Sequence, residues 1–320
     1  MQEGALQEPA AAKRSPGSAV LIANPTSGGY IYHAQQLKDT VTFLRAQGWQ
    51  VDLKLTQAAG DARWLAQEAV DQRVAMVVVA GGDGTINEVI QALAGSETAL
   101  GVLPGGTVNV WAREVGIPLD IAGAREVLIH GQIRSIDLGR VNERYFLLMA
   151  GIGLDGEVTH AIERQPVKRL GLIAYLFVGA WLGLGYPAFR ALLQVDGETI
   201  RANALQIIVG NTQLYAGTLK YTWQAMVDDG LLDVCIIYKR SMLGRIVVVL
   251  DFLRRKHRQR WIRYERCKQL KVLTRRAVGI QVDGDPAGYT AQGYPATVFA
   301  IAPAALKVIV PRKTPEGLFS

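Results

Sequence analysis

A short apolar run that ends in glycines and is followed by a helical repeat constrains the fold of this chain most. Residues 74–80 are apolar and rich in valine, which is typical of a buried parallel strand. The glycines within residues 81–84 allow a tight turn and close backbone approach, and from Thr85 onward the apolar residues follow a helical period. The pattern predicts a strand–loop–helix unit whose N–H groups and helix N-terminus bind an anion such as a phosphate.

Asp83 lies inside this loop, where a phosphate would bind. Two anions can share a site only if a divalent cation or a set of hydrogen-bond donors lies between them. Such an arrangement suits a Mg²⁺-nucleotide, and the spacing matches neither G-x-G-x-x-G nor a Walker loop with its lysine. The structural alternative is a glycine turn in which Asp83 caps the following helix.

Strands and helices alternate through the first half of the chain. Apolar runs at residues 19–23, 51–55 and 99–103 accompany the central unit, with helical spacing between them. This alternation predicts a parallel sheet with helices on both faces, and ligands of such sheets bind beyond the carboxyl ends of the strands. The polar or glycine-rich segments expected to meet in one crevice there are Asn24, Thr56, residues 81–87 and residues 104–109.

The pattern changes after residue 136. Short strands and turns take over, and Asp196-Gly197 and Asp283-Gly284 are signals for β-hairpins. This predicts a second, antiparallel domain. The expected organisation is a tail at 1–17, an α/β nucleotide-binding domain at 18–136, an antiparallel β domain at 137–310 and a tail at 311–320.

The composition of the chain indicates its cellular compartment and the charge of its binding partners. The 320 residues, 49% of them hydrophobic, are enough for two cores. Cys235 and Cys267 form neither a metal-binding spacing nor a disulfide framework, which fits a reducing cytosol. Residues 1–17 lack the apolar core of a signal peptide. The net charge of +7 favours an anionic partner: a nucleotide, a nucleic acid or an acidic membrane.

The loop Gly81-Gly82-Asp83-Gly84-Thr85-Ile86-Asn87-Glu88-Val89 resembles the nucleotide loop of the diacylglycerol kinase catalytic family, which includes bacterial lipid kinases and sphingosine kinases. NAD kinases share the Gly-Gly-Asp-Gly-Thr core, whereas Asn-Glu-Val favours the lipid kinases. Further matching segments follow the family's order over about residues 18–310. The resemblance implies an α/β plus all-β fold: a Rossmann-like parallel nucleotide-binding domain, then an antiparallel β-sandwich, with the active site between them.

The same resemblance implies which residues bind ATP. Asn24-Pro25-Thr26-Ser27-Gly28 is similar to the family's first loop, and residues 103–109 are similar to its Leu-Pro-x-Gly-Thr-x-Asn loop. The residues carried over are Asn24, Thr56, Gly81, Gly82, Asp83, Gly84, Thr85, Ile86, Asn87 and Thr107. Taken alone, Thr56 would be a surface cap, and Asn109 is equally compatible with a helix cap. Val110 departs from the family, because many members have Asp there.

A third matching segment, residues 226–234, implies a Mg²⁺ site. The resemblance assigns the ion to the Asp229 carboxylate and the main-chain carbonyls of Met226 and Leu231, which are hard oxygen ligands. This ion would be distinct from the one on ATP. The alternative is an Asp-Gly turn with solvated carboxylates, which is the preferred interpretation for Asp228.

The family places its general base in an Asp-Gly-Glu segment, which reads Asp283-Gly284-Asp285 here. The resemblance implies that Asp283 accepts the proton of a lipid hydroxyl as that oxygen attacks the γ-phosphorus of ATP. Asp285 replaces the usual Glu with a side chain one methylene shorter. Asp155, in a Gly-x-Gly-x-Asp segment that the family shares, either caps a helix or lines the cleft.

Two segments bear on membrane contact. Residues 170–189 carry no formal charge and are long enough for a transmembrane helix, but five glycines or prolines interrupt them. A helix that covers the lipid side of the cleft is therefore the expectation. Residues 254–264 combine clustered cations with Trp261 and Tyr264, which suits anionic lipid headgroups. Nucleic acid and a solvated helix end are the alternatives, and no nucleic-acid motif accompanies the segment.

The sequence thus favours an ATP- and Mg²⁺-dependent lipid kinase that phosphorylates a diacylglycerol-like hydroxyl. Its expected location is the cytoplasm, in peripheral contact with anionic membrane and without nucleic acid. The alternatives are a dinucleotide kinase like the NAD kinases and a non-catalytic membrane- or nucleotide-binding module. The acceptor lipid, the nucleotide preference and the oligomeric state stay open, with a homodimer among the states compatible with the sequence.

Overall fold

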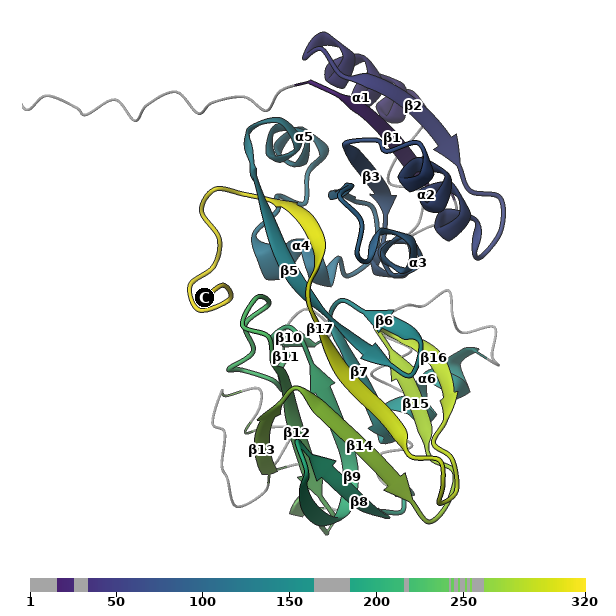
Figure 1. Cartoon of the computed structure of the whole chain (residues 1–320), viewed down its shortest axis with the longest axis vertical. Helices are drawn as coiled ribbons and strands as arrows, with labels where there is room; N and C mark the ends of the chain where they lie inside the picture. Colours follow the sequence, from purple (N-terminus) through teal and green to yellow (C-terminus); the bar gives the residue numbers. More distant parts are fainter. Residues whose placement is uncertain are drawn as a thin grey trace, which may run out of the picture.

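The computed structural model describes residues 16–25, 34–163, 185–215, 219–241, 243–244, 247, 251, 254 and 262–320. They form an α/β part and an all-β part, one above the other in Figure 1. The glycine-rich first loop from Thr26 to Gly29, the apolar segment up to residue 184 and the basic segment at 255–261 lie outside the described residues.

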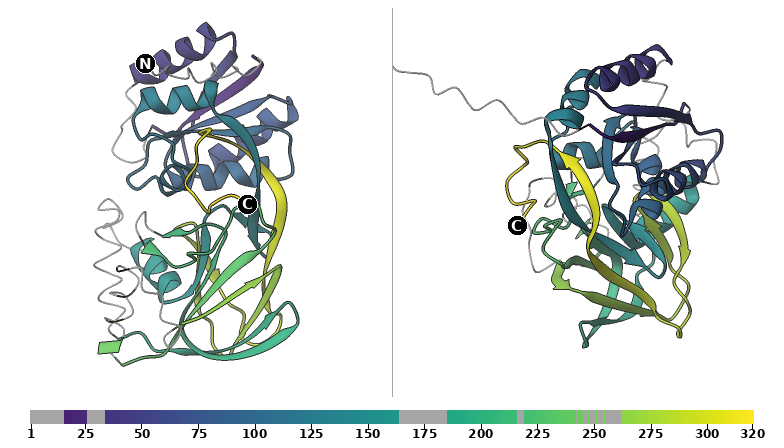
Figure 2. Two further views of the ribbon diagram at one scale, coloured as in Figure 1. Left: turned by 90° about the vertical axis from the view of Figure 1, so that its left-hand side faces the viewer. Right: turned by 45° about the horizontal axis from the view of Figure 1, so that its top comes forward.

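The α/β part is built around four parallel strands in the order β2-β1-β3-β4. Apolar, β-branched strands sit at its centre because helices cover both faces of the sheet (Figure 2). Arg125 of α5 donates to Thr40 of α1, and α2 packs against α3. The elements are β1 (Ser18–Ala23), α1 (Ala34–Ala46), β2 (Gln50–Leu55), α2 (Asp61–Asp71), β3 (Met76–Gly81), α3 (Asp83–Leu93), β4 (Ala99–Pro104), α4 (Val110–Val115) and α5 (Ile121–His130).

The all-β part is antiparallel and folds around its own apolar core. Strand β9 connects two groups of strands: its first half pairs with β8, and its second half pairs with β7 and β12. The elements are β5 (Gln132–Val141), β6 (Arg144–Phe146), β7 (Met149–Gly153), α6 (Leu154–Glu163), β8 (Phe189–Val195), β9 (Glu198–Gly210), β10 (Leu214–Tyr215), β11 (Leu219–Lys220), β12 (Leu232–Tyr238), β13 (Ile262–Cys267), β14 (Gln269–Thr274), β15 (Gly279–Val282), β16 (Asp285–Tyr289) and β17 (Thr297–Val310).

Strands β5 and β17 join the two parts. They pair along nearly their whole length, and Val308 of β17 also lies parallel to Leu100 of β4. An irregularity between Ala302 and Leu306 marks the crossing point, where the Asp137 carboxylate accepts a hydrogen bond from the Ala304 N–H. The domain boundary expected after residue 136 therefore falls inside a continuous strand.

The last residues of the chain pack against the all-β part. Leu318 is buried, its carbonyl accepts a hydrogen bond from the Val227 N–H, and the Gln213 side chain donates to the Gly317 carbonyl. These contacts fix the C-terminus over the turn that precedes β12.

The predicted fold class is confirmed: a parallel α/β sheet is followed by an antiparallel β part. Cys235 and Cys267 are both free and buried. In the part of the chain that the structure describes, no helix combines the length and apolar character needed to cross a membrane.

Candidate active site

A pocket of about 280 Å³ lies beyond the carboxyl ends of β1 and β2, between these strand ends and the helices α2 and α3. Asn24 follows β1, Thr56 follows β2, and Thr85 lies in the first turn of α3. The Asn24 amide donates to the Thr85 hydroxyl at 3.4 Å. The pocket is lined by Asn24, Thr56, Gln57, Ala58, Ala59, Ala62, Thr85 and Glu88. Three of the sequence-predicted residues therefore meet in one place.

The two glycine loops of the α/β part touch through their backbones. Gly82 precedes α3, Gly106 follows β4, and a Cβ atom added to Gly106 would lie 2.6 Å from the Gly82 Cα. The Gly105 N–H donates to the Gly81 carbonyl at 2.8 Å. Only residues without a side chain allow this contact, which explains the glycines at positions 82 and 106.

Asp83 ties the same loops together. Its carboxylate accepts hydrogen bonds from the N–H groups of Val110 at 3.0 Å and Trp111 at 3.2 Å, at the start of α4. Burial raises the pKa of this carboxyl. The Asp83 carboxylate thus has hydrogen-bond donors of the protein on both of its oxygens. Asp83 does not cap its own helix, because Gly82 holds that position. Since Val110 contributes only its backbone N–H, its departure from the family leaves the contact intact.

Thr107 and Asn109 have different roles in the second loop. Asn109 is in a left-handed conformation with φ 52°, and its amide makes two hydrogen bonds to the backbone of Gly106. Its side chain therefore holds the loop in shape. The Thr107 side chain is exposed and available to a ligand, whereas Ile86, also predicted from the sequence, is buried in the core.

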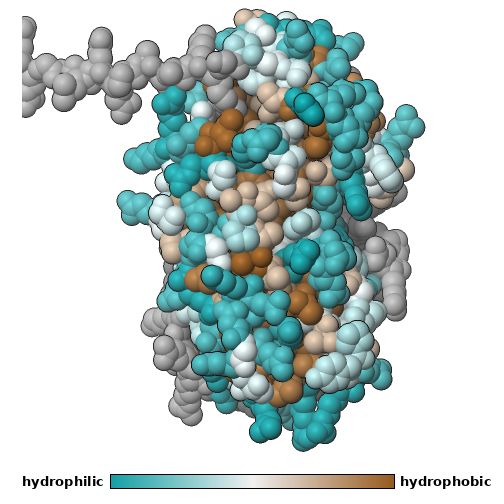
Figure 3. Space-filling view, viewed as in Figure 1, coloured by the Kyte–Doolittle hydropathy of each residue, from teal (hydrophilic) through white to brown (hydrophobic). Residues whose placement is uncertain are grey.

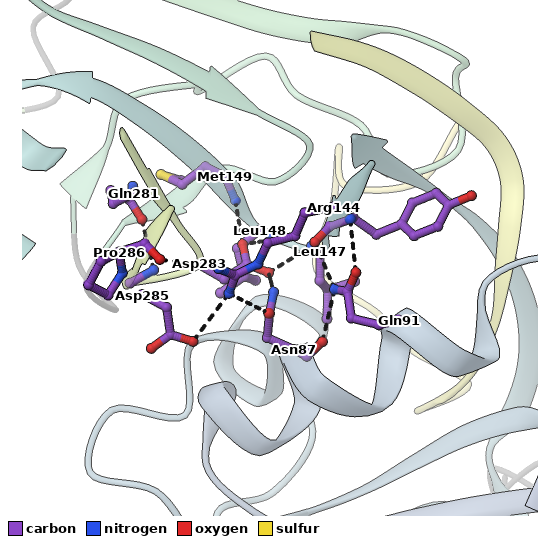
Figure 4. A network of polar contacts seen from close by, with 12 residues as sticks. Asn87, Gln91, Arg144, Leu147, Leu148, Met149, Gln281, Asp283, Asp285 and Pro286 are labelled. Atoms are coloured by element: carbon purple, nitrogen blue, oxygen red, sulfur yellow. Dashed lines mark hydrogen bonds and ion pairs between the residues drawn. The ribbon is translucent and has the colours of Figure 1, made fainter. Parts of the chain in front are cut away.

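Asn87 of α3 reaches across to the all-β part. Its amide nitrogen donates to the Asp283 carboxylate at 2.8 Å (Figure 4). Asp283 lies in the turn between β15 and β16, at a φ of 49°. The remaining donors to this carboxylate are the backbone N–H groups of Leu147, Leu148 and Met149, at 2.8–2.9 Å.

These contacts limit what Asp283 can do. A carboxylate offers about four acceptor positions, and each Asp283 oxygen already accepts two hydrogen bonds. Burial raises the pKa of Asp283 to about 6, although the four donors favour its ionised form. In this structure the Asp283 carboxylate therefore anchors the turn to α3 and to residues 147–149.

Asp285, two residues along the same turn, is placed differently. Its side chain is 44% exposed and lies 3.5 Å from the Arg144 guanidinium. Arg144 also donates to the Asn87 side-chain carbonyl at 2.9 Å and to the Pro286 carbonyl at 3.3 Å. The sequence analysis did not identify Arg144. Its only local signal is its position directly after the Asn142-Glu143 turn.

A series of hydrogen bonds between buried side chains supports the turn between β15 and β16. Gln281 accepts a hydrogen bond from the Gly284 N–H at 2.8 Å and donates to the Asp155 carboxylate at 2.7 Å. Tyr215 donates to the other oxygen of Asp155, and burial raises the pKa of this carboxyl to about 6. Asp155 thus supports the turn indirectly, a role that the sequence analysis did not consider.

The predicted metal ligands lie in a separate turn before β12. The Asp229 carboxylate accepts a hydrogen bond from the Leu231 N–H at 3.0 Å and is paired with Arg266. Among the described residues, no group of three His, Cys, Asp or Glu side chains could hold a metal ion. A carboxylate with main-chain carbonyls suits Mg²⁺ chemically, but Arg266 already neutralises Asp229, so an ion would compete with this guanidinium.

Comparison with known proteins shows that each part of the chain matches a domain model of a kinase family. Residues 18–141 match the family model of the diacylglycerol kinase catalytic domain, and residues 149–310 match the YegS C-terminal NAD kinase beta sandwich-like domain. The diacylglycerol kinase of Bacillus subtilis is 32% identical over 84% of this chain and 90% of its own length. That of Staphylococcus aureus is 31% identical over 84% and 86%.

A solved structure agrees with the observed fold. The crystal structure of a diacylglycerol kinase from Bacillus anthracis superposes with a TM-score of 0.71 at 20% identity, and the match covers 93% of this chain and 98% of the other. At this level of identity, the likeness supports the shared fold alone.

Proposed function

Because this chain belongs to the diacylglycerol kinase family, whose members transfer phosphate to an alcohol, we propose that it uses ATP and Mg²⁺ to phosphorylate a hydroxyl of a diacylglycerol-like lipid. The observation that carries the proposal is the hydrogen bond between Asn87 and Asp283. It brings the glycine-loop helix and the turn with two carboxylates into one cleft. A phosphate donor and a hydroxyl acceptor bound on either side would face each other there.

The ATP site that we propose is the pocket beyond β1 and β2. Backbone N–H groups of the glycine loop and the positive end of α3 favour phosphate groups at this position. The pocket volume of about 280 Å³ suits part of a nucleotide, with the remainder exposed to solvent. The proposed contacts are Asn24, Thr56, Gly81, Gly82, Gly84, Thr85, Asn87 and Thr107, while Asp83 and Ile86 act by holding the loop and the helix in place.

Mg²⁺ on the ATP phosphates would neutralise the charge that develops on the transferred group. Among the residues that line the pocket, Glu88 is the acidic one, and its carboxylate is the proposed contact of this Mg²⁺. Met226, Asp229 and Leu231 remain the proposed ligands of a second ion, which must displace Arg266 from Asp229. No step of the transfer is assigned to that second ion.

We assign the two carboxylates of the β15–β16 turn to different tasks. Asp283, with four donors on its oxygens, anchors the turn to α3 and to the start of β7. Asp285 has an exposed carboxylate on the same turn and is the general base in this proposal. It accepts the proton of the lipid hydroxyl while that oxygen attacks the γ-phosphorus and ADP departs. This moves the catalytic role by two residues from the position that the sequence implied.

The acceptor lipid must reach the cleft from a membrane, so we propose a cytoplasmic protein in peripheral contact with an anionic bilayer. The net charge of +7 supports attraction to such a surface. On the face shown in Figure 3, hydrophobic residues form small groups scattered among hydrophilic ones. This face therefore suits water or lipid headgroups better than the interior of a bilayer.

Transfer of ³²P from γ-labelled ATP to a total lipid extract tests the function. Label in the organic phase supports the proposal, and chromatography of that phase identifies the acceptor. Label that appears only in the aqueous phase, and only with added NAD, would indicate a dinucleotide kinase instead. ATP binding without any transfer would indicate a sensing module.

A further inference from the structure

Arg144 contacts both sides of the proposed active site. It is the first residue of β6, and its guanidinium donates to the Asn87 side chain on α3 and to the Pro286 carbonyl on β16. The same nitrogen that bonds Asn87, Nη2, lies 3.5 Å from the Asp285 carboxylate. Figure 4 shows these groups converging from three elements that are far apart in the sequence.

The chemistry of the three side chains determines how the Asn87 amide must lie. A guanidinium can only donate hydrogen bonds, and an ionised carboxylate can only accept them. The Asn87 oxygen therefore faces Arg144 at 2.9 Å, and its nitrogen faces Asp283 at 2.8 Å. The guanidinium and the carboxylate therefore select the same orientation of the amide, one from each end.

The position of Asp285 depends on the same cation. Asp is one methylene shorter than the Glu usual in the family, so the carboxylate stays closer to the turn. The long Arg144 side chain crosses this space and links Asp285 to the anchored Asn87. It also places a positive charge beside the Asp285 carboxylate.

From these contacts we propose that Arg144 is a positioning residue for phosphate transfer, which holds the Asp285 carboxylate in place relative to the nucleotide side of the cleft. This proposal rests on the proposed function and on the role of Asp285 in it. Arg144 does not need to touch either substrate to act in this way. Its effect should therefore fall on turnover rather than on nucleotide binding.

The test is a double-mutant cycle in which kcat and KM are measured for ATP and for the acceptor lipid that the labelling assay identifies. Arg144→Gln should lower kcat roughly 10- to 100-fold, since small misplacements of a reacting group cost about that much. The KM for ATP should change less than about twofold. In the Asp285→Asn background the same substitution should cost less than about threefold, because it acts through Asp285. Arg144→Lys should recover part of the loss, since it keeps the charge but not the fork of donors.

Arg140→Gln is the matched control. Arg140 lies on the same hairpin, is 43% exposed, and pairs with Glu143 outside the cleft, so its loss should leave kcat unchanged. An Arg144→Gln variant with wild-type kcat, or an equal loss in both backgrounds, would overturn the positioning role. A melting temperature and ATP affinity like those of wild type exclude misfolding as the cause of a loss. A wild-type protein that labels no lipid would instead refute the proposed function itself, and with it the reaction that Arg144 would serve.

Discussion

The amide nitrogen of Asn87 lies 2.8 Å from the carboxylate of Asp283, a residue 196 positions further along the chain. One belongs to the helix after the glycine loop, and the other to a hairpin turn of the all-β part. Their hydrogen bond sets the distance between the proposed nucleotide site and the proposed acceptor site.

Asn87→Ala should destabilise the protein by roughly 1–3 kcal/mol, because it removes one of the two hydrogen bonds to a buried Asp283 oxygen and the amide oxygen that accepts from Arg144. It should also lower kcat, since the two halves of the cleft lose their alignment. Urea denaturation and steady-state kinetics measure the two effects. Gln67→Ala is the control, because Gln67 makes a similar hydrogen bond on an exposed helix surface. Equal effects of both substitutions would contradict the linking role of Asn87.

Substitution of the two carboxylates to amides should separate their roles. Asp283→Asn points an NH₂ group at backbone N–H donors, so we expect a loss of roughly 3 kcal/mol in stability as well as activity. Asp285→Asn should keep the wild-type melting temperature and lose at least about 100-fold in kcat. Thermal melts and lipid phosphorylation assays on both variants decide the question. Full activity of Asp285→Asn would return the general-base role to Asp283.

The contact between the glycine loops makes a sharp comparison possible. Gly106→Ala places a Cβ 2.6 Å from the Gly82 Cα and should destabilise the fold by roughly 1–3 kcal/mol. Gly84→Ala meets no atom within 4 Å and lies in α3, so it should leave stability unchanged or raise it by up to about 1 kcal/mol. Denaturant unfolding of the two variants tests this. Equal tolerance at both positions would disprove the close approach of the loops.

Glu114 should make stability depend on pH near neutrality. Its carboxylate is buried against the N–H groups of Gln213 and Leu214, and burial raises its pKa to about 7. The folded state therefore binds a proton more readily than the unfolded chain, so stability rises as the pH falls. Glu114 should contribute roughly 1 kcal/mol of this rise between pH 8 and pH 6.

Unfolding free energies measured at both pH values, for wild type and Glu114→Gln, test the pH dependence. The wild-type gain on acidification should be larger by about that amount, since Gln does not titrate. Exposed Glu143→Gln serves as the control and should keep the wild-type gain, because its partner Arg140 stays charged at both pH values. A Glu114→Gln protein with the full wild-type gain would show that other groups are responsible.

Removal of Mg²⁺ tests the predicted ion at Asp229. If the ion binds the folded protein at a concentration about 100 times its Kd, it stabilises the fold by about 2.7 kcal/mol. Chelation should then lower the melting temperature of wild type and have little effect on Asp229→Asn. Arg266→Gln should strengthen the response, because it removes the competing guanidinium. Identical melting curves with Mg²⁺ and with chelator would indicate that Arg266 alone neutralises Asp229.

Local patterns in the sequence were sufficient for most of the elements and for the glycine-loop unit. They were wrong at residues 262–264, which were expected to belong to a basic helix end but begin strand β13, because pairing with β12 decides their conformation. The run of valines before Gly81 and the helical spacing after Thr85 specify a strand and a helix whatever surrounds them, since period and propensity act between near neighbours. The resemblance of the loop and of the Asp283-Gly284 turn to one family then predicted the two-part fold. The pocket around Asn24, Thr56 and Thr85 follows from the same rule for parallel sheets.

The roles of single carboxylates were decided by the tertiary structure alone. Asp83, Asp155 and Asp283 each receive donors from distant segments, and most of these donors are backbone N–H groups that every residue type carries. A backbone N–H is not tied to a residue type, so the sequence does not indicate where such a donor will lie. For this reason the sequence could not show that both oxygens of Asp283 accept hydrogen bonds from these donors, whereas Asp285 does not share them. Sequence motifs determined which segments of the chain form the proposed active site. Long-range hydrogen bonding determined which donors each of these carboxylates receives.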